Sequence, residues 1–509
     1  MNHFRLTLLI GSATSLTRIL GFLRDVLLAA LFGAGPVADA FFVALRIPNL
    51  VRRLMGEGGW TGAYVPIATK LISNNDSARE SSLIRDSLFC VSLLAASLVI
   101  LGEIWASDII KILAPGLSQD RSDLAVLYYR ALMPLIFGAT LTSLLSAILI
   151  SQKKFTLQAV APVFVNVVLV LLLAYFNSNN FLDYTKVGLI LSWAASAATF
   201  VQVFVLLIPV SFRLDKSLFT WSSFNPDFKA MAALALPSFV IQFSVQFGIL
   251  ILLNNASQTP GAISYLTYAE RLAQLPFGFI ASSLATIALP EFASRVIINN
   301  SEAFHRSIDR VMFLSIALAL PAAVSLVILA EPIVSVLFEI GAFGSADRIG
   351  TAAALAGFAL GLPFASVARV QMQLYFVFER VRIPLFATLL SSSLIGLLVQ
   401  MPLFSQSPFG FALAFSIGQV TVLILQQIGM KRLSGWVPEH DFRIRIYKIV
   451  FATIVLAVAL LIAKNALSPF LISDQPSSLR WGGLALLCLG GLGFYALTMN
   501  FLGLLRHFR

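Results

Sequence analysis

The stretch Arg18–Ile67 reads RILGFLRDVLLAALFGAGPVADAFFVALRIPNLVRRLMGEGGWTGAYVPI. It contains two apolar runs, which the helix-breaking sequence FGAGP separates. A helix needs about 20 apolar residues to cross the hydrocarbon core of a membrane. The runs extend over residues 6–33 and 37–70, are rich in Leu and Ala and do not alternate, which argues against strands. The stretch therefore predicts two consecutive transmembrane helices.

The composition extends this interpretation to the whole chain. Of its 509 residues, 58% are hydrophobic and 12% are charged, whereas a soluble domain has about 25% charged residues. So few charges exclude a soluble multidomain enzyme, a disordered chain and a secreted disulfide scaffold. We predict an all-α polytopic membrane protein with 14 transmembrane helices. The twelve further segments are 83–113, 124–151, 155–176, 186–209, 227–254, 261–294, 308–329, 347–377, 383–403, 409–431, 446–464 and 481–505.

The net charge of +11 follows the predicted topology. With a cytoplasmic N-terminus, the cytoplasmic loops and ends hold 21 Lys and Arg residues and the opposite loops hold six. The six are Lys111, Arg121, Lys186, Arg348, Lys464 and Arg480. This asymmetry predicts that both termini are cytoplasmic. Most of the positive charge is then topological and requires no nucleic acid.

Two halves of the chain share residues at one offset, which indicates an internal repeat. The pairs are Arg46 and Arg271, Pro66 and Pro290, Gly116 and Gly341, Pro134 and Pro363, and Lys153 and Arg380, separated by 225, 224, 225, 229 and 227 residues. We therefore expect two six-helix lobes, 1–212 and 226–432, related by an axis along the membrane normal. Two additional helices follow in 441–509. This pattern favours a transporter with a midplane site between its lobes over a channel.

Eight basic residues lie within the predicted spans, and all are arginines. They are Arg18, Arg24, Arg46, Arg52, Arg53, Arg130, Arg271 and Arg369, accompanied by Asp25, Asp39, Glu57 and Glu270. A charge at the centre of a membrane helix costs about 2.5–3.5 kcal/mol, so these groups must line water or pair. One interpretation is internal salt bridges, above all for Asp25, Arg46, Arg53 and Glu270. For Arg18, Arg24, Arg52 and Arg271 we favour an anionic ligand carrying phosphate, because guanidinium groups bind phosphate bidentately.

Motifs for other chemistry are absent from the sequence. It has no GxxxxGK[ST] loop, no HExxH and no GxSxG. Cys90 and Cys488 lie in apolar runs, and no histidine has metal-ligand spacing. We therefore predict a protein that is not an enzyme and has no catalytic residue, metal site or cofactor.

Three segments resemble the MurJ (MviN) family of lipid II flippases. They are Arg18–Ile67, TYAERLAQLPFGF (Thr267–Phe279) and FEIGAF (Phe338–Phe343). The resemblance implies the multidrug/oligosaccharidyl-lipid/polysaccharide exporter fold, with two lobes around a central cationic cavity. It implies a bacterial inner-membrane protein that moves undecaprenyl-pyrophosphate-linked disaccharide pentapeptide to the outer leaflet by alternating access. It also implies lipid II and the bilayer as partners, a functional monomer, and the cell-wall synthesis machinery as a further partner.

The same resemblance assigns expected roles to individual residues. By position, Arg18, Arg24, Arg52 and Arg271 are the expected pyrophosphate and headgroup contacts. Asp25, Asp39, Glu57 and Glu270 are the expected orienting or gating acids, and the two C-terminal helices are expected to form a groove for the lipid tail. Gln274 departs from the family pattern, in which this position can carry Glu.

Three different functions fit parts of the same sequence pattern. A multidrug or cation antiporter of the superfamily predicts a cavity rich in acids and aromatic residues, which the excess of arginine opposes. A flippase for another polyprenyl-linked oligosaccharide would share the cationic cavity. A non-transporting scaffold for envelope assembly predicts that replacing the arginines leaves growth unaffected. For a flippase, we expect the membrane potential to drive the empty cationic carrier inward.

Overall fold

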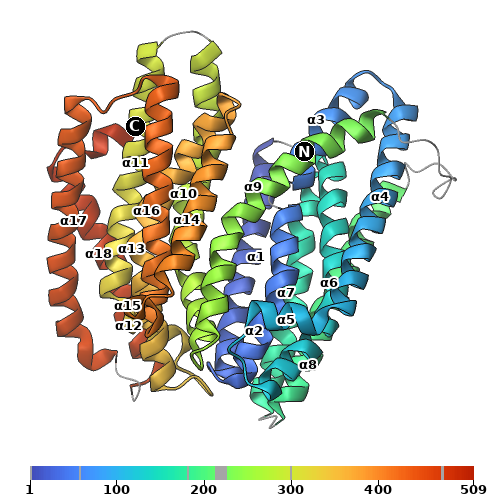
Figure 1. Cartoon of the computed structure of the whole chain (residues 1–509). Coiled ribbons are helices and arrows are strands. Elements are labelled where there is room, and N and C mark those ends of the chain that lie inside the picture. The colour runs from blue at the N-terminus through green and yellow to red at the C-terminus, as the bar shows by residue number, and fades with distance from the viewer. Residues whose placement is uncertain are drawn as a thin grey trace. The chain divides into compact units, whose positions relative to one another are not determined.

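The computed structural model describes residues 3–56, 59–179, 183–211, 226–297, 301–471 and 475–508. Every regular element in these ranges is a helix (Figure 1). The chain forms two compact units, unit 1 (Met1–Gln246) and unit 2 (Phe247–Arg509). The prediction of an all-α protein is therefore confirmed for the described residues.

Unit 1 contains eight complete helices in its described part. They are α1 (His3–Phe32), α2 (Pro36–Gly56), α3 (Gly59–Ser73), α4 (Ser77–Ile104), α5 (Ala106–Leu113), α6 (Gln119–Ser151), α7 (Phe155–Ser178) and α8 (Tyr184–Ser211). The next helix, α9 (Pro226–Ala256), begins in unit 1 and ends in unit 2. Within unit 1, α6 packs against α2, α4 and α8, and α1 packs against α7.

Unit 2 continues with nine α-helices and two short 3-10 helices in its described part. They are α10 (Ala262–Ile297), α11 (Ser301–Ile328), α12 (Ala330–Phe338), α13 (Ser345–Val377), α14 (Arg382–Leu398), α15 (Pro402–Ser405), α16 (Pro408–Ser434), α17 (His440–Leu467), η1 (Ser468–Phe470), α18 (Ser477–Phe501) and η2 (Leu505–Phe508). Within unit 2, α13 packs against α10, α11 and α16. The C-terminal helices share this core, because Leu456 of α17 and Tyr495 of α18 belong to one cluster with Phe313 of α11.

Eleven of the described helices are long and apolar enough to cross a membrane, and α14 is a shorter apolar helix of 17 residues. This finding confirms the polytopic class. The number of 14 transmembrane helices stays a prediction, as do the lobe boundaries 1–212 and 226–432.

The helix boundaries of the two halves correspond when the first half is shifted by 225 residues. The shift moves α4 (Ser77–Ile104) onto 302–329, where α11 spans Ser301–Ile328. It moves α6 (Gln119–Ser151) onto 344–376, where α13 spans Ser345–Val377. The short helices α5 and α12, which the sequence patterns did not separate from their neighbours, also correspond. This register supports the predicted internal repeat.

One segment of the first copy is described in two parts. The predicted span 37–70 is divided into α2, which ends at Gly56, and α3, which begins at Gly59. Glu57 and Gly58 lie outside the described residues. The corresponding helix of the second copy, α10, is continuous from Ala262 to Ile297. The single helix α10 therefore covers the positions that correspond to both α2 and α3.

The GxxxG motif at Gly357–Gly361 packs two helices of unit 2 together. A Cβ atom at Gly361 would lie 2.9 Å from the Cα atom of Ser416, and one at Gly357 would lie 2.8 Å from the carbonyl oxygen of Phe409. The Ser416 hydroxyl donates to the Gly357 carbonyl oxygen at 2.7 Å. Small residues therefore let α13 and α16 approach closely, as is common between membrane helices.

Candidate functional site

In unit 1 the predicted pair of Arg24 and Asp25 on α1 is in contact. Nε and Nη2 of Arg24 donate to Oδ1 of Asp25 at 3.1 and 2.8 Å. The side chains of Arg24 and Asp25 are 25% and 13% exposed. The carboxylate therefore fixes the direction of the guanidinium group while part of that group stays accessible.

A third residue, Asn166 of α7, contacts the same arginine. Nη1 of Arg24 donates to Oδ1 of Asn166 at 3.4 Å, and the Asn166 amide donates to the carbonyl oxygen of Thr17 on α1, also at 3.4 Å. Asn166 is 9% exposed. Asn166 is not among the predicted site residues because it carries no charge, although a single Asn in the apolar run PVFVNVVLV was a signal for it.

Arg24 keeps unused hydrogen-bonding capacity in this arrangement. A guanidinium group has five N–H donors. Three of them are used, two on Asp25 and one on Asn166. Two N–H groups of Arg24 are thus without a protein acceptor among the described residues, which is the capacity that a phosphate oxygen needs.

The predicted residues of α2 contact amide side chains. Arg52 is exposed, and its Nε donates to Oδ1 of Asn49 at 3.4 Å. Arg53, interpreted above as a salt-bridge residue, donates through Nη1 to Oε1 of Gln246 on α9 at 3.3 Å. In both of these contacts the acceptor is a neutral amide oxygen.

The remaining predicted residues of unit 1 differ in exposure. Arg18 is exposed on α1. Asp39 is 1% exposed and lies in the first turn of α2, where the helix dipole favours a carboxylate. The prediction for Glu57 falls outside the described residues.

In unit 2 the predicted residues Glu270 and Arg271 lie on α10, and both are partly buried. Nε2 of Gln274 donates to Oε1 of Glu270 at 2.6 Å. The residue that departs from the family pattern is therefore a direct partner of the adjacent acid. An amide at position 274 supplies a donor to the carboxylate, whereas a second carboxylate would repel it.

Two further features bear on the predictions. Arg130, the seventh residue of its predicted span 124–151, is 57% exposed, and its Nε lies 3.8 Å from Oε2 of Glu103. Among the described residues, no group of three or more His, Cys, Asp or Glu side chains could hold a metal ion.

Comparison with known proteins identifies the family. The family model described as Lipid II flippase MurJ matches residues 28–476. The chain is 33% identical to a probable lipid II flippase MurJ of Rhizobium meliloti (strain 1021) over 480 residues, which is 92% of this chain and 88% of the relative. This chain belongs to the MurJ family of lipid II flippases. It is also 28% identical to the lipid II flippase MurJ of Burkholderia cenocepacia, over 90% of this chain and 89% of the relative.

Solved structures show the same fold as this MurJ family member. A lipid II flippase MurJ in an inward closed conformation superposes with a TM-score of 0.80 at 23% identity, over 97% of this chain and 99% of the other. An inward-facing multidrug resistance MATE family transporter of the MOP superfamily superposes with a TM-score of 0.68 at 15% identity, over 87% and 98%. The exporter fold implied by the sequence resemblance is therefore confirmed.

Proposed function

We propose that this chain moves lipid II from the inner to the outer leaflet of the bacterial cytoplasmic membrane. Membership of the MurJ family over residues 28–476 supports this substrate. The observation that carries the site is the fixed and partly exposed Arg24, held by Asp25 and Asn166 with two N–H donors left. A pyrophosphate carries the charge and the oxygen acceptors that such a guanidinium group binds.

In the proposed mechanism the protein lowers the free energy of moving a charged headgroup through hydrocarbon. Arg18, Arg24, Arg52 and Arg271 contact the pyrophosphate and the headgroup, and Asp25 orients Arg24. Asp39, Glu57 and Glu270 act in orientation or gating. Alternating access then exposes the headgroup to one side of the membrane at a time, while the lipid tail stays in the bilayer along α17 and α18. No bond is made or broken, so the chain needs no catalytic residue.

The membrane topology is part of the same proposal. Both termini lie in the cytoplasm, as the asymmetry of Lys and Arg predicts. The chain acts as a monomer beside the cell-wall synthesis machinery. This orientation places the residues around Arg348 and Arg480 toward the outside.

The proposal is tested by complementation of a bacterium depleted of its own flippase. We expect the unmodified chain to restore growth and to make lipid II accessible to a probe in the outer leaflet. Arg24→Ala should insert in the membrane and fail, and Arg24→Lys should also fail in large part, because one ammonium group cannot contact Asp25 and a phosphate in the same fork geometry.

The matched control is Lys186→Ala, which removes a cation whose side chain is 76% exposed beside Asp183. It should complement like the unmodified chain. Normal flipping by Arg24→Ala would disprove the site assignment. Growth without any movement of lipid II would instead favour a scaffold in envelope assembly.

A further inference from the structure

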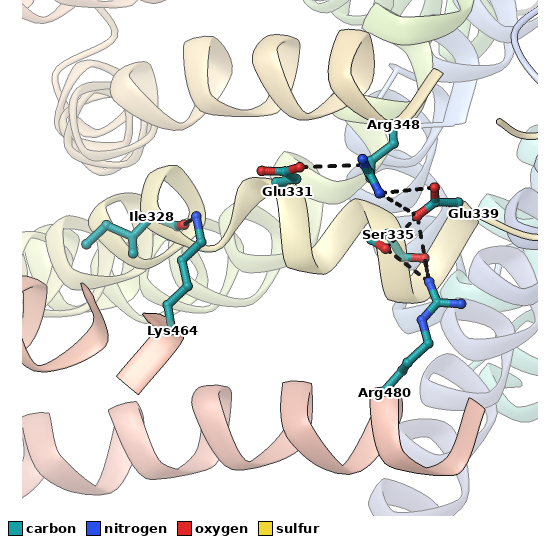
Figure 2. A network of polar contacts seen from close by, with 7 residues as sticks. All are labelled: Ile328, Glu331, Ser335, Glu339, Arg348, Lys464 and Arg480. Carbon is teal, nitrogen blue, oxygen red and sulfur yellow. Dashed lines mark hydrogen bonds and ion pairs between the residues drawn. The ribbon is translucent and has the colours of Figure 1, made fainter. Parts of the chain in front are cut away.

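A network of polar side chains lies in unit 2, around the turn between α12 and α13, at the end predicted to face outward (Figure 2). We call it the outer clamp and define it as Glu331, Ser335, Glu339, Arg348 and Arg480. Nη1 of Arg348 donates to both carboxylate oxygens of Glu339 at 3.1 and 3.2 Å, and Nε lies 3.6 Å from Oε1 of Glu331. The Ser335 hydroxyl donates to Oε2 of Glu339 at 2.6 Å. These bonds fix the turn between α12 and α13.

Arg480 attaches α18 to this turn. Its Nη2 donates to the Ser335 carbonyl oxygen at 2.6 Å and to the Ser335 hydroxyl at 3.0 Å, and lies 3.8 Å from Oε2 of Glu339. The Arg480 side chain is 8% exposed. Removing one partner from such a buried ionic group leaves the other charge uncompensated, so this contact resists separation.

Two further hydrogen bonds attach α17 and α18 to α11 of the same unit. The Tyr495 hydroxyl of α18 donates to the Ala317 carbonyl oxygen of α11 at 2.8 Å. Nζ of Lys464, on α17, donates to the Ile328 carbonyl oxygen at the end of α11 at 3.1 Å (Figure 2). The attachment of α17 and α18 therefore does not depend on apolar packing alone.

The segment from α12 to α13 also holds α10. The Tyr268 ring of α10 packs against Phe338 and Phe343 with centroid distances of 5.3 and 5.7 Å. The Tyr265 hydroxyl of the same helix donates to Oδ1 of Asp347 at 3.3 Å. Arg271 follows Tyr268 by three residues on α10, so it lies less than one helical turn from this aromatic contact.

We propose that the outer clamp joins α18 and the Arg271 region of α10 into one rigid body that persists through transport. Arg480 is then a positioning residue, since it acts through Ser335 and Glu339 and not on the substrate. This inference rests on the proposed function for the roles of Arg271 at the headgroup and of α17–α18 at the tail. Its consequence is that unit 2 carries both contacts together, so the headgroup and the tail of one lipid are not drawn apart.

Distances between spin labels on α10 and α18 test the proposal in the full-length protein in lipid nanodiscs. Cys90 and Cys488 are replaced by Ala, and labels are attached at Phe279→Cys and Leu486→Cys, whose native side chains are 62% and 60% exposed. We expect one narrow distance distribution that stays the same when lipid II is added. Arg480→Met should broaden it and reduce outer-leaflet lipid II in cells, and Arg480→Lys should restore part of both.

The control is Arg306→Met, which removes an exposed ion pair with Glu302 in the same unit and should change neither readout. Should Arg480→Met not insert, Ser335→Ala removes only one hydroxyl and should broaden the distribution to a smaller extent. A shift of about one helical turn (~5 Å) or more on adding lipid II would overturn the rigid body. An unchanged distribution in both Arg480→Met and Ser335→Ala would overturn the clamp. The width of the distance distribution is measured without any transport. If the chain flips a different lipid, the proposed function is refuted, but the inference about the outer clamp is not affected.

Discussion

Arg24 combines two properties that an anion site in a membrane requires. Asp25 holds its Nε and Nη2 at 3.1 and 2.8 Å, which sets the plane of the guanidinium group. The contact with Asn166, at 3.4 Å, is long for a hydrogen bond to a charged donor. A phosphate oxygen can bind the two N–H groups that Asp25 and Asn166 leave over, while these two residues keep the side chain in place.

Replacing Asn166 with Leu should weaken the binding of lipid II without unfolding the protein. The change removes one acceptor of Arg24 and a contact between α7 and α1, and we expect a loss of about 1 kcal/mol, roughly fivefold in Kd. The measurement is binding of labelled lipid II to the purified protein. Asn177→Leu is the matched control, because Asn177 also joins α7 to α1, through the Leu27 carbonyl oxygen at 3.2 Å, but does not contact Arg24. Equal losses in the two variants would mean that Asn166 acts only in packing.

The sequence located the charged residues of the site but not their neutral partners. An arginine in an apolar run is conspicuous because its insertion is costly. Asn49, Asn166 and Gln246 contact the arginines through amides, which leave no trace in a count of charges. Their roles depend on which helices pack together, and the order of residues along the chain does not contain that information.

At the scale of the helix, the first residue of α3, Gly59, is closely packed. A Cβ atom at this position would collide with the Phe239 ring of α9 and would lie 2.6 Å from the Leu54 carbonyl oxygen. The adjacent Trp60 packs against the same Phe239 ring, with a centroid distance of 5.1 Å. The absence of a side chain at Gly59 thus lets α3 approach the first part of α9 within unit 1.

Gly59→Ala should lower the stability of the purified protein. We expect a loss of about 1–3 kcal/mol, the range for adding a methyl group where no space exists. Gly62→Ala is the control in the same helix, because a Cβ atom there meets nothing within 4 Å. It should leave the thermal unfolding temperature unchanged or raise it, since alanine favours the helix. A Gly59→Ala protein that unfolds at the same temperature as Gly62→Ala would contradict the close approach.

Apolar length predicted the long helices well and their interruptions poorly. The segment 83–113 has no proline and no glycine pair, yet α4 ends at Ile104 and α5 begins at Ala106. The backbone turns at Trp105, whose φ and ψ angles are −101° and 21°. The turn belongs to the repeat, because α5 corresponds to α12 in the second half. This correspondence can be recognised only when the boundaries of both short helices are known.

At the scale of the whole molecule, most of the predicted outward-facing cations have partners. Arg348 and Arg480 contact Glu339, and Lys464 donates to a backbone carbonyl. Lys186 lies 3.0 Å from Asp183, and its hydrogen bond lowers the pKa of that carboxyl group. On α1, Arg24 contacts both Asp25 and the amide of Asn166, and on α2 Arg52 and Arg53 contact amide oxygens. Arg24 also keeps two N–H donors beyond its contacts with Asp25 and Asn166, so its charge can respond to a bound anion or to an electric field.

The membrane potential should therefore accelerate flipping. One elementary charge that crosses the field changes the free energy by about 2.3 kcal/mol per 100 mV, and an inside-negative potential draws an empty cationic site toward the cytoplasm. Bound pyrophosphate neutralises the site and removes this bias, which permits outward opening with the lipid. We expect outer-leaflet lipid II to fall when valinomycin with external potassium collapses the potential, and to persist when nigericin removes only the pH gradient. A loss of outer-leaflet lipid II with nigericin alone would assign the driving force to protons. Because the bias requires the positive charge of the site, an unchanged amount of outer-leaflet lipid II with valinomycin would show that the resetting step carries no net charge.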